Sequence, residues 1–404
     1  MAADYGLRTL AAIGDIAAAD WDSLANPGWR LGPHGHIEPT EPDPAAFNPF
    51  LSHAFLSALE QSGTTGAEAG WLPHHLLLEQ DGRPVAAAPT YVKGHSFGEY
   101  VFDQGWADAL ERSGGHYYPK LQTAVPFTPV TGPRLLARDG NARLALAEGL
   151  VLLTRHHRLS SAHVTFADHR DMAALTAKGF LVRHDRQYHF RSDGYRDYAD
   201  FLDALSSRKR KALKRERREA LAGGIAIDWL TGSDLREAHW DAFFDFYMDT
   251  GDRKWGTPYL NRAFFSLVSE RLADRILLVM ARRGDRYIAG ALNFIGSDRL
   301  YGRYWGAIEP QPFLHFEACY HQAIDFALAH GLQVVEAGAQ GEHKIARGYM
   351  PVETSSAHFI ADPGFRRAVA AFLEEERAMV DAETAALAAE GPFRRGGDNG
   401  DQAD

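Results

Sequence analysis

Residues 300–351 read LYGRYWGAIEPQPFLHFEACYHQAIDFALAHGLQVVEAGAQGEHKIARGYMP, and this stretch decides the fold. The β-favouring residues at 300–307 predict a strand. From Phe316 to Leu328, apolar residues at every third or fourth position predict the buried face of a helix that ends at Gly331. The apolar run at 333–337 predicts a second strand. Strand, helix and strand in this order are typical of an α/β unit, and the glycine-punctuated loop that follows is a place where binding residues collect.

Composition sets the limits of the interpretation. A chain of 404 residues with 45% hydrophobic residues is long enough for two domains. The net charge of −10 argues against a nucleic-acid-binding surface over the whole protein, so any anion site must be local. Cys319 is the single cysteine, which excludes an internal disulfide and fits a reducing compartment. The sequence has neither a secretory signal pattern nor an apolar run of membrane-spanning length, so we expect a soluble cytoplasmic protein.

The two halves of the chain follow one plan. LLLEQDGRPVAAAPTYV at residues 76–92 has a counterpart in LLVMARRGDRYIAGALNFI at residues 277–295. Each segment predicts a strand, a charged glycine turn and a second strand of small and apolar residues. An expected aromatic strand follows each, YVFDQGW from Tyr100 and LYGRYWG from Leu300, and then a helix and a buried strand. This order predicts two copies of one α/β unit.

A strongly basic helix is predicted between the two copies. SSRKRKALKRERREALAGG at residues 206–224 begins with capping serines and ends with two glycines. Eight cations fall within eleven positions of an otherwise acidic protein, which favours RNA phosphate or a diphosphate-bearing precursor as the partner. A solvated charged face is the alternative. The expected nucleic-acid-binding residues are Arg208, Lys211, Lys214, Arg215 and Arg218.

Several of these segments together resemble one family. The paired α/β units, the SSRKRKALKRERREA helix, FYMDTGDRKWGTPYLNRAFF at 246–265 and AGAQGEHKIARGYMP at 337–351 are similar to the FemAB-like proteins. These are peptidoglycan biosynthesis or recognition proteins placed among the GNAT-type acyltransferases. The resemblance extends from about residue 47 to about residue 376.

The resemblance implies a fold and an activity. The expected fold is α/β (α+β), with two tandem GNAT-like domains whose mixed central sheets are flanked by helices. The expected domains are 1–190 and 225–392, the latter carrying the site, with 191–224 as a connecting segment that contains the basic helix and 393–404 as a disordered tail. The implied activity moves an acyl or aminoacyl group to an amine. No tightly bound cofactor is expected, and acyl-CoA or aminoacyl-tRNA would be the co-substrate.

Two departures from the family pattern bear on the donor. Coenzyme A enzymes of this type hold the pyrophosphate on an R/Q-x-x-G-x-G/A loop at a helix N-terminus. Here the corresponding helix begins PQPFLHFEACY, which has no glycine to let the backbone approach a pyrophosphate. This favours aminoacyl-tRNA as donor, although the long coiled-coil arm associated with tRNA contact in Fem proteins is also missing.

Acyl transfer to an amine needs a base and groups that hold the acyl donor. The predicted bases are Glu336, His343 and Glu317. Glu336 ends an apolar strand, where burial could raise the pKa of its carboxyl; the alternative is a carboxylate fixed structurally by Arg303 or Arg347. The expected substrate-binding residues are Arg303, Lys344, Arg347, Tyr301, Tyr304, Trp305, His315, Gln340, Glu342, Arg253, Lys254 and Trp255.

One possible site is set aside, and two alternative functions stay open at this point. HFEACYH at 315–321 resembles a metal motif, but a helix places only two of its ligands on either face, so no metal site is predicted. A protein that kept the fold but lost catalysis could recognise muropeptide or RNA. An ordinary acetyl-CoA-dependent enzyme acting on a small amine is the other alternative function.

Overall fold

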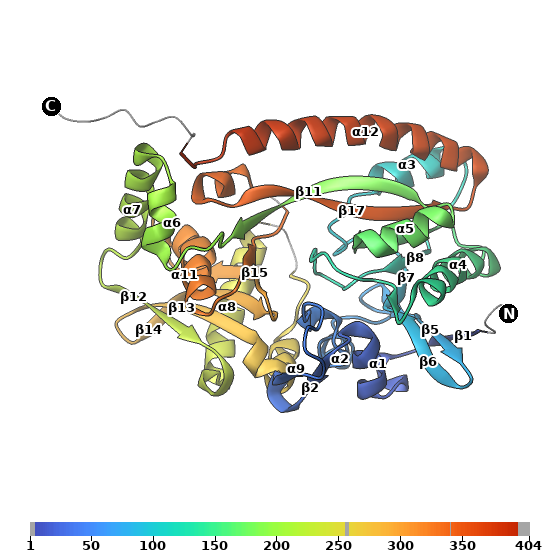
Figure 1. Ribbon diagram of the computed structural model, residues 1–404, viewed down its shortest axis with the longest axis horizontal. Coiled ribbons are helices and arrows are strands. Elements are labelled where there is room, and N and C mark those ends of the chain that lie inside the picture. Colours follow the sequence, from blue (N-terminus) through green and yellow to red (C-terminus); the bar gives the residue numbers. More distant parts are fainter. Residues whose placement is uncertain (1–4, 255–257, 340, 395–404) are drawn as a thin grey trace. The chain divides into compact units, whose positions relative to one another are not determined.

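The computed structural model describes residues 5–254, 258–339 and 341–394, with the side chains of 252–254 left out (Figure 1). The chain forms two compact units. Unit 1 comprises Met1–Asp185, Tyr259–Arg275 and Glu353–Asp381, and unit 2 comprises Arg186–Pro258, Ile276–Val352 and Ala382–Asp404. Two strands are shared by the units along the chain: β11 (Leu181–Arg191) ends in unit 2, and β17 (Met350–Ile360) ends in unit 1.

Unit 1 contains two groups of strands. The first is an antiparallel sheet in the order β1 (Gly6–Leu10), β5 (His75–Gln80), β6 (Arg83–Ala88) and β9 (Leu136–Ala137). The second runs from β4 (Trp71–Pro73) through β7 (Thr90–Lys93), β8 (Lys120–Thr123) and β10 (Ser161–Ala167) to β17. Its helices are α1 (Ala18–Ala25), α2 (His53–Gln61), α3 (Gln104–Arg112), α4 (Gly140–His156), α5 (His169–Ala177), α9 (Arg262–Leu272) and most of α12 (Pro363–Ala389).

Unit 2 has one run of strands, in the order β12 (Ile225–Leu230), β13 (Ile276–Arg283), β14 (Arg286–Ile295), β15 (Arg299–Ala307), β16 (Val334–Glu336) and β11. Only β15 and β16 are parallel among these pairs. The helices are α6 (Tyr198–Ala204), α7 (Ser207–Ala220), α8 (Glu237–Lys254), α10 (Leu314–Phe316) and α11 (Gln322–Ala329), with a π-helical turn, η6 (Glu317–His321), between the last two.

Apolar side chains explain why these strands form a sheet core. Six consecutive residues of β13, beginning at Ile276, are buried, as expected for a strand covered on both faces. Helix α8 packs so closely on β15 that a Cβ at Gly306 would lie 2.1 Å from the carbonyl oxygen of Phe246. Glycine is therefore required at this point of β15 for the helix to approach the sheet.

The expected fold class is confirmed: both units combine a mixed sheet with flanking helices. Each unit contains an antiparallel strand pair, β7 with β8 in unit 1 and β14 with β15 in unit 2. A helical segment follows, and a later strand then pairs in parallel with the second strand of the pair: β10 with β8, and β16 with β15. No helix within the described ranges is long and apolar enough to cross a bilayer.

One expected strand is wrong. The aromatic run after Tyr100 is a loop, and β8 takes the place assigned to it. The backbone φ of Tyr100 is +59°, a left-handed conformation that interrupts a strand. Glu99 precedes Tyr100 and Asp103 follows it, and both carboxylates accept hydrogen bonds from Lys120. The loop brings the two side chains to this one lysine.

Each compact unit is made of three separate segments of the chain, whereas the expected domains are continuous ranges. Residues 259–275 and 353–381 belong to unit 1, and α7 belongs to unit 2. Side-chain contacts account for the first two segments: Asn261 and Arg271 of the α9 region bond to Ser62 and Ser57, and Glu376 of α12 bonds to Arg183. The ranges 1–190 and 225–392 stay a prediction about the two copies.

Candidate functional site

The first feature of the candidate site is the point where the parallel strands of unit 2 part. Pairing between β15 and β16 ends at Tyr301 and Glu336, whereas β15 continues to Ala307 with only β14 as a described partner. The pairing of β14 with β15 skips Arg303, which makes this residue a β-bulge. Bulges re-aim side chains and are frequent next to functional sites.

Glu336 lies at this point and is only 3% exposed. Its Oε1 accepts a hydrogen bond of 2.9 Å from Arg299 Nη1. Among the described residues Oε2 has no hydrogen-bond partner, and His189 Nε2 is 4.0 Å away. One oxygen is thus held by a guanidinium, while the other is buried without a hydrogen-bond partner among the described residues. From the sequence, Arg303 or Arg347 is the alternative partner expected to hold this carboxylate. In the structure the partner is Arg299.

His343 lies in the loop after β16, in the short helix η7 (Glu342–Arg347). Its Nε2 is 3.1 Å from the hydroxyl of Tyr320, and its ring contacts those of Phe316 and His315. Partial burial lowers the pKa of His343, and the neighbouring cations Arg347 and Lys344 lower it further. The imidazole is therefore neutral at neutral pH, the state that a general base requires.

Of the other predicted residues in this part of unit 2, Trp305 lies near the same rings, whereas Tyr304 contacts the ring of Tyr247 in α8. Trp305 contacts the ring of His315 at 5.3 Å, and Arg303 lies 5.3 Å from the ring of Tyr304. Lys344 is buried and donates to the carbonyl of Gly338 over 3.2 Å, and burial lowers its pKa to about 8. Tyr301 is buried and Glu342 is exposed.

Glu317 and Arg347 occupy a different environment from the one expected. Glu317 is fully buried, and its carboxylate is bonded by Arg217 and by Gln322 Nε2. Arg347 bonds to both oxygens of Glu216, and Glu216 also bonds to His321. These pairs connect α7, η6 and η7, so the placement favours a positioning role for both residues.

The basic helix α7 divides into two faces. Its buried residues are Leu213, Glu216 and Ala220, and Arg217 is turned inward to Glu317. The five cations predicted to contact nucleic acid are all exposed: Arg208, Lys211, Lys214, Arg215 and Arg218. Arg215 pairs with Glu219 on the same helix over 3.3 Å. The exposed face thus remains strongly basic.

Four predicted residues cannot be placed in the site. Gln340 and Trp255 lie outside the described residues, and the side chains of Arg253 and Lys254 are likewise not described, although their backbone belongs to α8.

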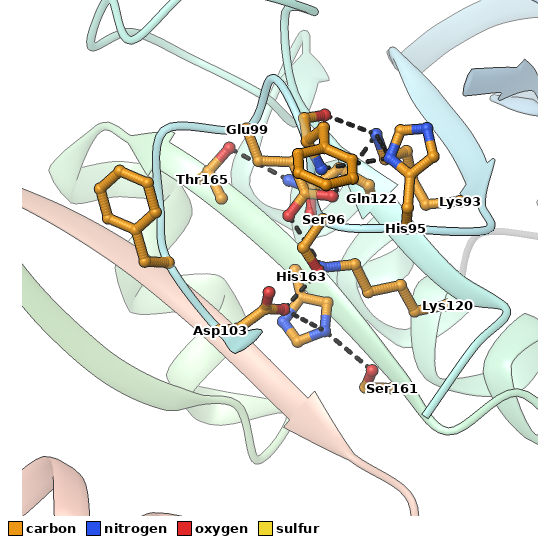
Figure 2. A network of polar contacts seen from close by, with 12 residues as sticks. Lys93, His95, Ser96, Glu99, Asp103, Lys120, Gln122, Ser161, His163 and Thr165 are labelled. Atoms are coloured by element: carbon orange, nitrogen blue, oxygen red, sulfur yellow. Dashed lines mark hydrogen bonds and ion pairs between the residues drawn. The ribbon is translucent and has the colours of Figure 1, made fainter. Parts of the chain in front are cut away.

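Sequence reasoning missed a buried charged network in unit 1 (Figure 2). Lys120 of β8 donates to Glu99 Oε2 over 2.8 Å, to Asp103 Oδ2 over 2.5 Å and to Ser96. Lys93 of β7 donates to the carbonyl of Phe97 and lies 3.5 Å from the ring centroid of Trp71. All four charged side chains are at most 4% exposed. Figure 2 shows Glu99 and Asp103 reaching from the loop before α3 toward Lys120.

The network continues through two histidines. His163 Nδ1 lies 2.7 Å from His358 Nδ1, and His163 Nε2 lies 2.8 Å from Ser161 Oγ. Burial lowers the pKa of His163 to about 3, so this ring is neutral. The sequence signal was present but weak: a lysine stands at one end of each of two otherwise buried strands, TYVK and KLQT.

Lys93 predicts an unusual pH dependence of stability. Burial lowers its pKa to about 7, well below the usual 10.5. Between these values the unfolded chain holds the additional proton, so the free energy of unfolding should rise with pH from about 7 to about 10, by at most about 1.4 kcal/mol per pH unit. Denaturant titrations across this range should show the slope, and Lys93→Met should remove it. Identical slopes for the two proteins would contradict the assignment.

The sequence and the fold are both similar to those of known proteins. The FemAB-like family, described as peptidoglycan biosynthesis/recognition, matches residues 12–395. A crystal structure of FemX is similar with a TM-score of 0.52 and 11% identity, covering 88% of this chain and 98% of that chain. L-PGS from Bacillus licheniformis gives a TM-score of 0.49 and 10% identity, covering 87% of this chain and 98% of that chain. A search of curated protein sequences gave no match.

Proposed function

Because the chain belongs to the FemAB-like family, we propose that it is an N-acyltransferase that moves an acyl or aminoacyl group to an amine. The expected donor is aminoacyl-tRNA, with acyl-CoA as the alternative, and a cell-wall peptide precursor is one candidate acceptor. Both donors are cytoplasmic compounds, so we place the protein in the cytoplasm. The likeness to FemX concerns the fold, and the proposed chemistry rests on the residues of unit 2.

The observation that carries the proposal is the Glu336 carboxylate oxygen, Oε2, which has no hydrogen-bond partner among the described residues and lies where β15 and β16 part. In the proposed reaction the amine nitrogen attacks the acyl carbonyl carbon and the new C–N bond forms. The bond from that carbon to the tRNA oxygen, or to the sulfur of a thioester, breaks, and the leaving atom takes up a proton. Glu336 or His343 accepts the proton that the amine loses.

The basic face of α7 supports aminoacyl-tRNA over acyl-CoA. Its five exposed cations extend along one helix, as a phosphate backbone requires, whereas a coenzyme needs a compact pyrophosphate site. The helical segment that follows β15 begins at Leu314 after Phe313, without a glycine loop. A protein that binds RNA or muropeptide without catalysis remains the second candidate, because the same face would serve it.

A donor comparison tests the proposal. Gel shifts with a charged tRNA pool should show binding, and if α7 contacts four phosphates the affinity should fall about 50- to 150-fold between 50 and 200 mM salt. The variant Lys211→Glu, Lys214→Glu, Arg215→Glu, Arg218→Glu should abolish this shift. Transfer of the labelled amino acid to an amine is then followed by mass spectrometry.

The other outcomes separate the alternatives. Thermal stabilisation by acetyl-CoA together with no tRNA shift would make this an acetyl-CoA enzyme. A salt-sensitive tRNA shift with no transfer to any amine would favour the binding protein. If the charge-reversed variant binds tRNA as the unaltered protein does, α7 is not the contact surface.

A further inference from the structure

Three metal-binding side chains converge in unit 1, outside the residues proposed for acyl transfer. His184 comes from β11, Glu353 from β17 and Asp381 from α12. One donor atom of each lies within 4.8 Å of the other two. We propose that His184, Glu353 and Asp381 bind a divalent transition-metal ion, and that zinc best matches this set of one imidazole and two carboxylates.

The distances fit a shared ion better than direct hydrogen bonds. His184 Nδ1 is 3.5 Å from Asp381 Oδ1 and 3.6 Å from Glu353 Oε2. A good hydrogen bond from nitrogen to oxygen spans about 2.7–3.2 Å, so the imidazole reaches neither oxygen well. Zinc holds nitrogen and oxygen ligands at about 2.0–2.2 Å, and two such atoms at tetrahedral positions are about 3.4 Å apart.

Charge supports the same interpretation. The two carboxylates repel each other at this separation, and a bound cation would offset the repulsion. The neighbouring cation on β11 is already engaged, because Arg183 pairs with Glu376 over 2.6 Å. The contribution of three separate elements, two strands and a helix, distinguishes the site from a run of acidic residues on one element.

A cavity adjoins these ligands and gives an ion access to small molecules. Its volume is about 720 Å³, and its wall includes His184 and Glu353 together with Asp168, His169 and Thr354. Zinc sites with three protein ligands keep one coordination position for water or a substrate. The cavity therefore offers room for an oxygen-donor ligand, such as a carboxylate or a carbonyl group, beside the proposed ion.

No motif in the sequence indicates this metal site. His184 and Glu353 are more than one hundred positions apart in the sequence. Neither β11 nor β17 has a second possible ligand two positions from these residues, where it would lie on the same face of the strand. HFEACYH is the stretch in which candidate ligands are closely spaced, and it lies elsewhere in the chain, so the sequence predicts no metal at this place.

Zinc titration of the full chain tests the proposal. Protein freed of metals with EDTA is titrated with Zn²⁺ by isothermal calorimetry, and one ion per chain should bind with at least micromolar affinity. His184→Ala and Glu353→Gln should each weaken this binding at least about 10-fold, because a zinc site needs three or four ligands. An excess of Mg²⁺ should not displace zinc, since magnesium prefers oxygen ligands.

A control variant at another histidine shows whether the loss of zinc binding is specific to His184. His36 forms a surface pair with Glu38 over 3.7 Å, so His36→Ala removes a comparable histidine and should leave the tight binding unchanged. If His184→Ala fails to fold, the exposed Asp381→Asn provides the same test. The absence of one-to-one zinc binding, or equal affinity in the His184 and His36 variants, would overturn the site. Anomalous scattering from zinc-soaked crystals should place the ion between the three side chains.

Discussion

Replacing Glu336 with glutamine should lower the rate of acyl transfer by about 10²- to 10⁴-fold, the usual contribution of a general base. Glutamine has nearly the same shape and its amide oxygen can still accept the hydrogen bond from Arg299, so the fold should persist. What is lost is the basic oxygen, Oε2, at the point where β15 and β16 part. Steady-state kinetics with saturating donor and acceptor measure the effect.

A matched control keeps this result interpretable. Asp193→Asn makes the same chemical change at an exposed carboxylate of unit 2 and should leave the rate within about twofold. His343→Asn should also slow transfer, and the pH profiles of the two single variants show which of the two groups takes the proton. If Glu336→Gln keeps full activity while His343→Asn loses it, Glu336 has a structural role and His343 is the base.

Much of the fold could be predicted from the sequence because its signals are local. The buried run of β13 and the three-to-four-residue spacing from Phe316 to Leu328 depend on neighbours in the chain, and both led to elements of the expected type. The π-helical turn at Glu317–His321 was not predicted, since apolar spacing does not distinguish it from a regular helix. The loop after Tyr100 was misread because Lys120, the partner of its carboxylates, is distant in sequence.

The candidate site was predictable only in part for the same reason. Glu336 and His343 stand at a strand end and in a glycine-flanked loop, two positions that sequence patterns identify. The pairing of Glu317 with Arg217, 100 positions away, has no local signal. Arg217 was counted with the cations of the basic helix, although its side chain turns inward. Helical periodicity gave little guidance there, because α7 buries Glu216 beside Leu213 and Ala220.

Replacing Lys120 with methionine should destabilise unit 1 by about 3–5 kcal/mol, the cost of removing one partner from a buried ion pair. Burial lowers the pKa of Lys120, but the carboxylates of Glu99 and Asp103 outweigh burial and raise the pKa above its usual value. The ammonium is therefore charged, and its loss leaves Asp103 without its lysine and Glu99 with only Lys93, 3.6 Å away, although both carboxylates are at most 4% exposed. Denaturant unfolding at neutral pH measures the change.

The control and the rescue identify the cause as buried charge. Lys178→Met makes the same substitution at a partly exposed lysine paired with Glu148, and surface pairs contribute at most about 1 kcal/mol. Adding Glu99→Gln and Asp103→Asn to Lys120→Met should recover part of the lost stability, because neutral amides cost less to bury than unpaired carboxylates. A loss below about 1 kcal/mol for Lys120→Met would mean that water reaches the network. Recovery in the triple variant would show that the loss in Lys120→Met comes from burying carboxylates without their cation, and not from the shape of the methionine side chain.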